Sequence, residues 1–104
     1  MSVTVIETLD QFKAEIAKDQ LTIVDFWATW CGPCIRIAPF FKQKAAEETG
    51  INFCKVDVDE NDETAGHVGI KCMPTFKFYK GGNLVETLEG ASQDQINNLI
   101  AKHK

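Results

Sequence analysis

The 104-residue sequence lacks long apolar runs, and it also lacks clusters of basic residues. A membrane-spanning helix needs about 20 consecutive apolar residues, whereas the most apolar stretch, residues 21–30, is interrupted by Asp25. Eleven Lys and Arg are scattered among fifteen Asp and Glu, for a net charge of −4. Binding to nucleic-acid phosphates requires clustered cations. We therefore expect neither a membrane nor a nucleic acid as a partner.

The first residues show no charged segment followed by an apolar one, which is the pattern of a secretory leader. We therefore expect a cytoplasmic protein. Structural disulfides are rare in that reducing compartment, so the four cysteines indicate redox chemistry, metal binding or core packing. The residues around each cysteine indicate which of these purposes it serves.

No repeat, low-complexity tract or linker divides the sequence, so we expect one domain over residues 1–104. Runs rich in β-branched and apolar residues predict strands, and amphipathic segments between them predict helices. The capping patterns Thr8 with Gln11 and Ser92 with Gln95 mark two helix starts, and Gly81–Gly82–Asn83 predicts a hairpin. The predicted strands are 3–6, 21–27, 51–58, 75–79 and 84–89, and the helices follow Thr8, Pro33, Asp59 and Ser92. This order predicts an α/β fold with a mixed five-stranded sheet flanked by four helices.

Two of the four cysteines, Cys31 and Cys34, are separated by Gly32 and Pro33 at a predicted strand-to-helix junction. Residues three apart on a helix have Cβ atoms about 5–6 Å apart, and a disulfide needs roughly 4 Å, so a small adjustment closes the bond. Pro33 suits the first turn of a helix. The free N–H groups and positive dipole end of that helix favour a thiolate at Cys31, which is the nucleophilic form.

Zinc binding and inert packing are the alternatives for this pair. A structural zinc site needs further ligands at close spacing, but Cys54 and Cys72 are far apart, and His67, five residues before Cys72, has no companion. Inert packing leaves the adjacent glycine, proline and tryptophans unexplained. Redox chemistry is therefore favoured, and no bound metal is expected.

The segment from Val24 to Cys34 (VDFWATWCGPC) resembles the active-site segment of the thioredoxin family. The resemblance continues in order through residues 55–61 (KVDVDEN), 73–76 (MPTF), 81–82 (GG) and 90–91 (GA), and covers essentially the whole chain. It implies the thioredoxin fold and a protein disulfide reductase without a bound cofactor. The segment from Lys71 to Phe76 is most similar to cytosolic thioredoxins of animals.

The resemblance implies that Cys31 is the exposed attacking thiolate and that Cys34 is the buried thiol that resolves the mixed disulfide. Gly32 and Pro33 carry no charge that would further stabilise the thiolate, and relatives with a histidine in this dipeptide are oxidants or isomerases. Reduction is therefore the expected direction. Family members often have Lys after the second cysteine, where this sequence has Ile35.

Asp25 interrupts an apolar strand that we expect to be covered on both faces. Burial raises the pKa of a carboxyl group and lets it exchange protons near neutral pH, whereas an aspartate on an open edge would simply be solvated. The resemblance implies that Asp25 exchanges the proton of Cys34, with Lys55 as a nearby partner. A solvated charge is the alternative for Lys55.

Pro74 precedes a predicted strand, where a proline is ordinary. The resemblance instead implies a cis Met73–Pro74 bond packed against the disulfide, which would expose the Met73 backbone to an extended target peptide. The resemblance also implies that the same substrate groove is lined by Trp30, Thr75, Gly90 and Ala91.

The remaining cysteines have different predicted environments. Cys54 lies in the middle of a predicted strand, and inert packing explains it best. Cys72 adjoins the predicted groove and resembles a position open to regulatory oxidation or an intermolecular disulfide. We expect His67 and His103 to be surface residues without chemistry.

The resemblance implies recharging by thioredoxin reductase, a flavoprotein that supplies electrons from NADPH. Expected clients are peroxiredoxin, methionine sulfoxide reductase and ribonucleotide reductase. We expect a monomer, with a dimer through Cys72 as the alternative. The competing functions are a disulfide isomerase or oxidase, a glutaredoxin, and a binding protein that needs neither active cysteine.

Overall fold

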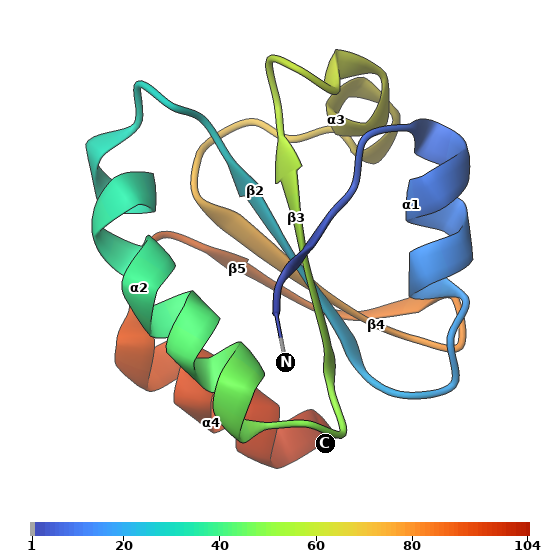
Figure 1. Ribbon diagram of the computed structural model, residues 1–104, viewed down its shortest axis with the longest axis vertical. Helices are drawn as coiled ribbons and strands as arrows, with labels where there is room; N and C mark the ends of the chain where they lie inside the picture. Colours follow the sequence, from blue (N-terminus) through green and yellow to red (C-terminus); the bar gives the residue numbers. More distant parts are fainter. Residues whose placement is uncertain (1) are drawn as a thin grey trace.

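The computed structural model describes residues 2–104 and contains a five-stranded sheet with helices on both faces (Figure 1). The described elements are, in chain order, β1 (Thr4–Val5), α1 (Leu9–Ile16), β2 (Thr22–Trp27), α2 (Gly32–Glu47), β3 (Asn52–Asp57), α3 (Asp62–Val68), β4 (Thr75–Lys80), β5 (Asn83–Glu89) and α4 (Gln93–His103). The predicted number and order of elements are confirmed.

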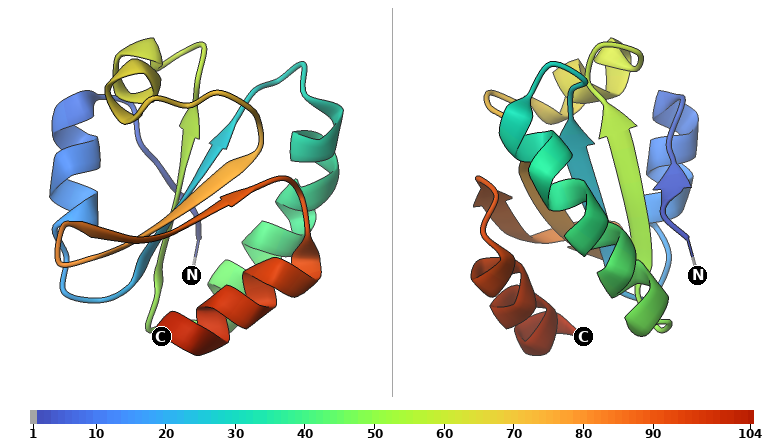
Figure 2. Two further views of the ribbon diagram at one scale, coloured as in Figure 1. Left: turned by 180° about the vertical axis from the view of Figure 1, so that it is seen from behind. Right: turned by 60° about the vertical axis from the view of Figure 1, so that its left-hand side comes forward.

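The strands lie in the order β1-β3-β2-β4-β5, with β1, β3 and β2 parallel and β4 and β5 antiparallel to their neighbours. The mixed sheet is therefore confirmed. β2 lies at its centre, and its residues from Thr22 to Phe26 are all buried. Helices α1 and α3 cover one face of the sheet, and α2 and α4 cover the other (Figures 1 and 2).

Each face of the sheet has its own apolar core. Phe41 of α2 packs its ring at 5.2 Å from Phe53 and 5.5 Å from Phe76, in the core that α2 and α4 cover. On the opposite face, the ring of Phe12 from α1 lies 6.2 Å from Phe26 and 5.7 Å from Tyr79. Burial of these aromatic rings on both faces stabilises the fold and keeps β2, which lies between them, away from solvent.

Side-chain caps set the starts of the shorter helices. Thr8, Asn61 and Ser92 each accept a hydrogen bond from the backbone N–H three residues later, which satisfies one of the free donors of the first turn. α3 begins at Asp62 rather than at Glu60, because the Asp57 carboxylate accepts from the N–H groups of residues 59 and 60 and holds them in a turn.

Each of the five strands differs from its predicted bounds by one residue at one or both ends. β1 comprises only Thr4–Val5, since those two residues alone pair with β3. α2 ends at Glu47 because Glu48, with φ −97° and ψ 72°, leaves the helical conformation. In the described residues no helix is long and apolar enough to cross a membrane.

The β4–β5 hairpin turns at Gly81 (φ 58°) and Gly82 (φ 85°), and both lie in the left-handed region. Two successive positive φ values are typical of the type I′ turn, whose twist matches that of paired strands. A side chain at either position would be strained. Gly66, in contrast, lies within α3 without a positive φ.

Substituting alanine at these glycines should change stability in opposite directions. A methyl group at Gly66 or Gly82 meets no atom within 4 Å, so backbone conformation alone decides the effect. We expect Gly66→Ala to stabilise the fold by about 0.5–1 kcal/mol and Gly82→Ala to destabilise it by about 1–2 kcal/mol. Urea unfolding of both variants measures this, and equal shifts in the same direction would contradict the turn assignment.

Candidate active site

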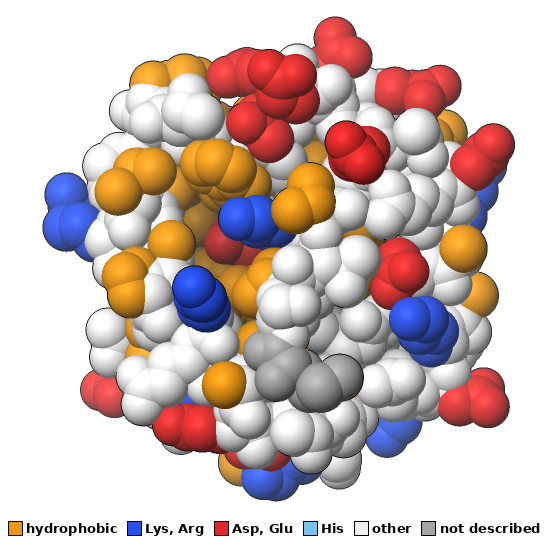
Figure 3. Space-filling model, in the orientation of Figure 1, with side chains coloured by type: hydrophobic (Ala, Val, Ile, Leu, Met, Phe, Trp, Pro, Cys, Tyr) orange, Lys and Arg blue, Asp and Glu red, His pale blue; other side chains and the backbone are white. Residues whose placement is uncertain are grey.

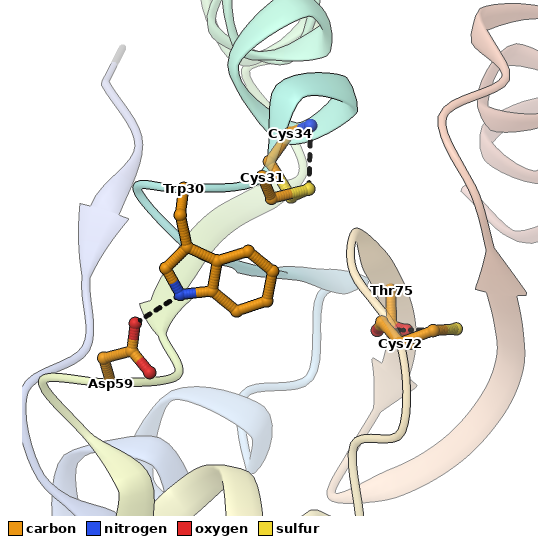
Figure 4. The surroundings of a disulfide bond; sticks show 6 residues. All are labelled: Trp30, Cys31, Cys34, Asp59, Cys72 and Thr75. Atoms are coloured by element: carbon orange, nitrogen blue, oxygen red, sulfur yellow. Dashed lines mark hydrogen bonds between the residues drawn. A yellow bond between two sulfur atoms is a disulfide. The ribbon is translucent and has the colours of Figure 1, made fainter.

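Cys31 and Cys34 form a disulfide at the junction of β2 and α2, with their Cα atoms 5.3 Å apart (Figure 4). Cys31 is the N-cap of α2, and its sulfur accepts a hydrogen bond from the Cys34 N–H at an N···S distance of 3.3 Å. Pro33 lies in the first turn, where no backbone donor is lost. The N-terminal end of α2 therefore places an N–H group and its positive dipole end at the Cys31 sulfur.

Both cysteines are largely covered in this oxidised state. Cys31 is 6% exposed and Cys34 is 1% exposed. The expectation that Cys31 is exposed is therefore wrong, because Ala28, Met73 and neighbouring side chains pack around the disulfide. The expected difference between the two is present, since Cys31 has the larger accessible area and Cys34 faces the core.

The Met73–Pro74 peptide bond is cis, as predicted. Met73 packs against the apolar cluster that contains the two cysteines, and Pro74 is buried. The Pro74 carbonyl accepts a hydrogen bond from the Gly90 N–H at 2.9 Å, which joins this segment to the end of β5. The predicted groove residues Met73, Pro74 and Gly90 are thus brought together.

The side chain of Thr75 does not face the predicted groove. Thr75 is 2% exposed, and its hydroxyl donates to the Cys72 carbonyl at 2.7 Å. Cys72 itself is exposed, and its sulfur points away from the disulfide (Figure 4). Any contact of a peptide with Thr75 therefore involves backbone atoms.

Trp30 is the most exposed of the large apolar side chains described, with 67% of its surface accessible. Its indole Nε1 donates to Asp59 Oδ2 at 2.8 Å, which holds the ring beside the disulfide (Figure 4). Sequence reasoning missed the role of Asp59. It belongs to the 55–61 segment that carried the resemblance, but nothing in the sequence pairs it with a residue 29 positions earlier.

Pro33 and Ala91 line one small hollow together with Arg36. Gly32, Pro33 and Ala91 are all exposed. The surface around the disulfide therefore comprises the start of α2, the Met73–Pro74 loop and the segment after β5.

Asp25 is 4% exposed, and its Oδ1 atom has no hydrogen-bond partner among the described residues. The sheet register places it between Lys55 on β3 and Phe76 on β4. Burial raises the pKa of this carboxyl group to about 7, and the positive charge of Lys55 opposes that shift without cancelling it. Asp25 can therefore gain or lose a proton near neutral pH.

A hollow of about 240 Å³ joins Asp25 to the disulfide, since Asp25, Cys34 and Lys55 all line it. The ammonium group of Lys55 lies 5.4 Å from the centre of the Trp27 ring, in the range of a cation–π contact. Lys55 is half-buried rather than a freely solvated charge. The structure thus brings together the three residues that sequence analysis assigned to proton transfer.

Residues 3–102 match the sequence model of the thioredoxin family. The thioredoxin of Malassezia sympodialis is 44% identical over 97% of this chain and 98% of its own length. That of Geodia cydonium is 51% identical over 85% of this chain and 84% of its own length. The crystal structure of Fasciola hepatica thioredoxin superposes with a TM-score of 0.95 at 39% identity, covering 98% of this chain and 100% of the other.

This chain belongs to the thioredoxin family. Thioredoxins reduce the disulfide of a protein substrate while their own active-site dithiol is oxidised to a disulfide. In this chain Cys31 and Cys34, which form a disulfide in the structure, are that redox pair. The chain is therefore a thiol–disulfide oxidoreductase that acts as a protein disulfide reductase.

The other two cysteines, Cys54 and Cys72, lie in contrasting environments, because Cys54 is buried and Cys72 is exposed. Cys54 is fully buried, as expected, and burial raises the pKa of its thiol to about 12, which leaves it inert at neutral pH. No cluster of three or more metal-ligating side chains is found within residues 2–104.

His103 differs from the expectation that it is a surface residue, because it is mostly buried and its Nε2 lies 3.0 Å from Glu86 Oε2.

Removal of the Asp59 carboxylate should free the Trp30 indole. We expect Asp59→Ala to shift the Trp30 indole N–H resonance upfield and to speed its exchange with solvent, because the hydrogen bond is lost. Proton–nitrogen NMR measures both effects, and the buried indole of Trp27 serves as the internal control. An unchanged Trp30 signal would show that Asp59 does not hold the ring in solution.

Proposed function

We propose that this thioredoxin reduces protein disulfides in the cytoplasm, with Cys31 as the attacking nucleophile and Cys34 as the resolving thiol. The single observation that carries the assignment of the two roles is the position of Cys31 at the N-cap of α2, where the Cys34 N–H donates to its sulfur. A thiolate at Cys31 would receive that hydrogen bond and the helix dipole, whereas Cys34 is one turn further into the helix and almost fully buried.

In the first step, the Cys31 thiolate attacks one sulfur of the client disulfide. A Cys31–client S–S bond forms, the client S–S bond breaks, and the other client sulfur leaves as a thiolate that takes up a proton. The Cys34 N–H at the start of α2 donates to the Cys31 sulfur in the oxidised protein, and we assign it the same contact during this step. Attack requires the cover around Cys31 to open slightly, since only 6% of the residue is exposed.

In the second step, Cys34 loses its proton and attacks the Cys31 sulfur. The Cys31–Cys34 bond forms again and the second client thiolate leaves, so the client gains two electrons in all. Asp25 supports this step because it lines the same hollow as Cys34 and its pKa is raised to about 7. We assign it the role of accepting the Cys34 proton.

Lys55 acts on Asp25 rather than on the sulfur atoms. It pairs with Asp25 in the β2–β3 register and lines the same hollow, and its charge lowers the pKa of the carboxyl group. Without that charge, burial alone would hold the proton more tightly. Lys55 is therefore proposed as a positioning residue that keeps Asp25 able to release its proton near neutral pH.

The client peptide is proposed to lie in extended form across Trp30, the Met73–Pro74 loop and Ala91. The indole of Trp30 is exposed beside the disulfide, and the small, exposed Ala91 lines a hollow together with Pro33, which lies between the two cysteines in the sequence. The Gly90 N–H already donates to the Pro74 carbonyl, so we assign the pairing with the client backbone to Met73. Gly32 and Pro33 themselves carry no charge, which supports reduction rather than oxidation.

Electrons are proposed to come from NADPH through thioredoxin reductase. Peroxiredoxin, methionine sulfoxide reductase and ribonucleotide reductase are the proposed clients. One structural neighbour, at 31% identity and a TM-score of 0.91, comes from a study of thiol resolution in a yeast mitochondrial 1-Cys peroxiredoxin through glutathione and thioredoxin systems. This supports peroxiredoxin as a client class. We propose a monomer, with Cys72 exposed for an oxidative dimer.

Reduction of insulin driven by NADPH and thioredoxin reductase tests this function. We expect rapid turnover with the unmodified chain and loss of essentially all activity in Cys31→Ser, because no nucleophile remains. Cys34→Ser should instead accumulate client mixed disulfides on Cys31, identified by mass spectrometry. Cys54→Ser is the matched control, since that buried thiol takes no part. Insulin reduction that persists in Cys31→Ser would refute the assignment of the nucleophile, whereas no reduction by the unmodified chain would favour a binding protein that needs neither active cysteine.

A further inference from the structure

A second, larger hollow opens on the α2 side of the sheet, next to the catalytic one. It has a volume of about 540 Å³, and its walls include Val3 from the chain before β1 and Ala38 and Phe41 from α2. Figure 3 shows a depression on this face in which hydrophobic side chains surround both acidic and basic atoms. Its size falls in the range of pockets that hold small organic ligands, roughly 300–1,000 Å³.

The large hollow is continuous with the hollow that reaches Cys34. Asp25, Ile35, Ala38 and Lys55 line both of them. Ile35 is 50% exposed, so it presents an apolar side chain to solvent at the boundary between the two. An apolar molecule in the large hollow would therefore contact Ile35 and lie within reach of the buried end of the catalytic site.

Three charged side chains line this mostly apolar space. Lys42 projects from α2 and is exposed, Lys55 comes from β3, and Asp25 contributes the buried Oδ1 atom that lacks a partner within residues 2–104. A buried polar atom without a partner is uncommon in folded proteins and marks a place where a ligand or water can bind. Two lysines against one carboxyl group leave the lining with a net positive charge whether or not Asp25 holds a proton, and the charge is larger when Asp25 is protonated.

We propose that the large hollow binds a small apolar anion, a molecule with a hydrophobic body and a single carboxylate or sulfonate group. The body would pack on Val3, Ala38 and Phe41, and the anion would lie near Lys42 and Lys55. Charge complementarity excludes a cation of similar shape, because the two ammonium groups would repel it. No residue assigned above to the exchange of disulfides is needed for the apolar contacts.

Occupancy of the hollow would act on the proton of Asp25. An anion nearby disfavours the ionised carboxylate, so the ligand binds better when Asp25 is protonated. The groups that face Asp25 are Lys55 from β3, Cys34 from α2 and Phe76 from β4, while Lys42 lies at the rim. Binding should therefore weaken as the pH rises from 6 to 8. Because Asp25 is the proposed proton acceptor, an occupant would also slow the Cys34 step, a consequence that rests on the proposed function.

Binding of anilinonaphthalene sulfonate to the oxidised protein tests the site by fluorescence. This probe has an aromatic body and one sulfonate, and N-phenylnaphthylamine provides nearly the same body without the charge. We expect the sulfonate to bind more tightly and Lys42→Glu to weaken it about fivefold. Lys13→Glu is the matched control, because it makes the same charge change at an exposed position of α1, on the opposite face of the sheet. Asp25→Asn should remove the pH dependence.

NMR shift changes locate the probe independently of the variants. We expect the largest changes at the amides of Val3, Ala38 and Lys42. Three outcomes would overturn the proposal: equal weakening by Lys42→Glu and Lys13→Glu, equal affinity for the uncharged analogue, or shift changes confined to Trp30 and Ala91. The assay contains no client, NADPH or reductase, so its failure is distinguishable from a failure of the proposed reductase function.

Discussion

The burial of a single carboxyl group beneath the disulfide is the constraint on which the rest of the structure depends. β2 lies at the centre of the sheet with helices on both faces, so the side chain of Asp25 has almost no access to water. Desolvation raises its pKa to about 7, and Lys55 limits the rise. The same packing places Cys34 in the hollow that Asp25 lines. The position of one strand therefore connects the fold to the proton chemistry of the redox pair.

The surface around the disulfide depends on segments that are far apart in the sequence. The cis Met73–Pro74 loop is joined to the end of β5 through the Gly90 N–H, and Trp30 is held by Asp59 from the loop after β3. These hydrogen bonds fix the edges of the surface, while the two cysteines lie at the start of one helix. A rigid surround of this kind lets a small domain present a covered disulfide to an extended peptide.

Much of this fold could be predicted from local sequence signals. Alternating strand and helix patterns, caps at Thr8 and Ser92, and the Gly81–Gly82 turn each depend on residues close in sequence, and all agree with the structure. The register that pairs Asp25 with Lys55 could not be derived from local pattern, because it depends on how two strands align. The family resemblance, rather than physical reasoning, predicted the cis Met73–Pro74 bond, the reductase and the client proteins.

The sequence was least informative about burial and long-range hydrogen bonds. The cover around Cys31, the inward hydroxyl of Thr75 and the Trp30–Asp59 contact all come from packing between distant segments. His103 likewise has no local signal for its contact with Glu86, which lies 17 residues away on β5. Such features follow from the assembled tertiary structure, so no pattern of nearby residues indicates them.

The most direct test of this account is an NMR titration of the Asp25 carboxyl carbon in the oxidised protein. The buried environment predicts a midpoint near pH 7, since the pKa is raised to about 7 by burial. Lys55→Gln should move the midpoint upward, because it removes the positive charge that stabilises the carboxylate. A midpoint near pH 4, the ordinary range of a solvated aspartate, would contradict the account, because Asp25 could not then take up the Cys34 proton at neutral pH.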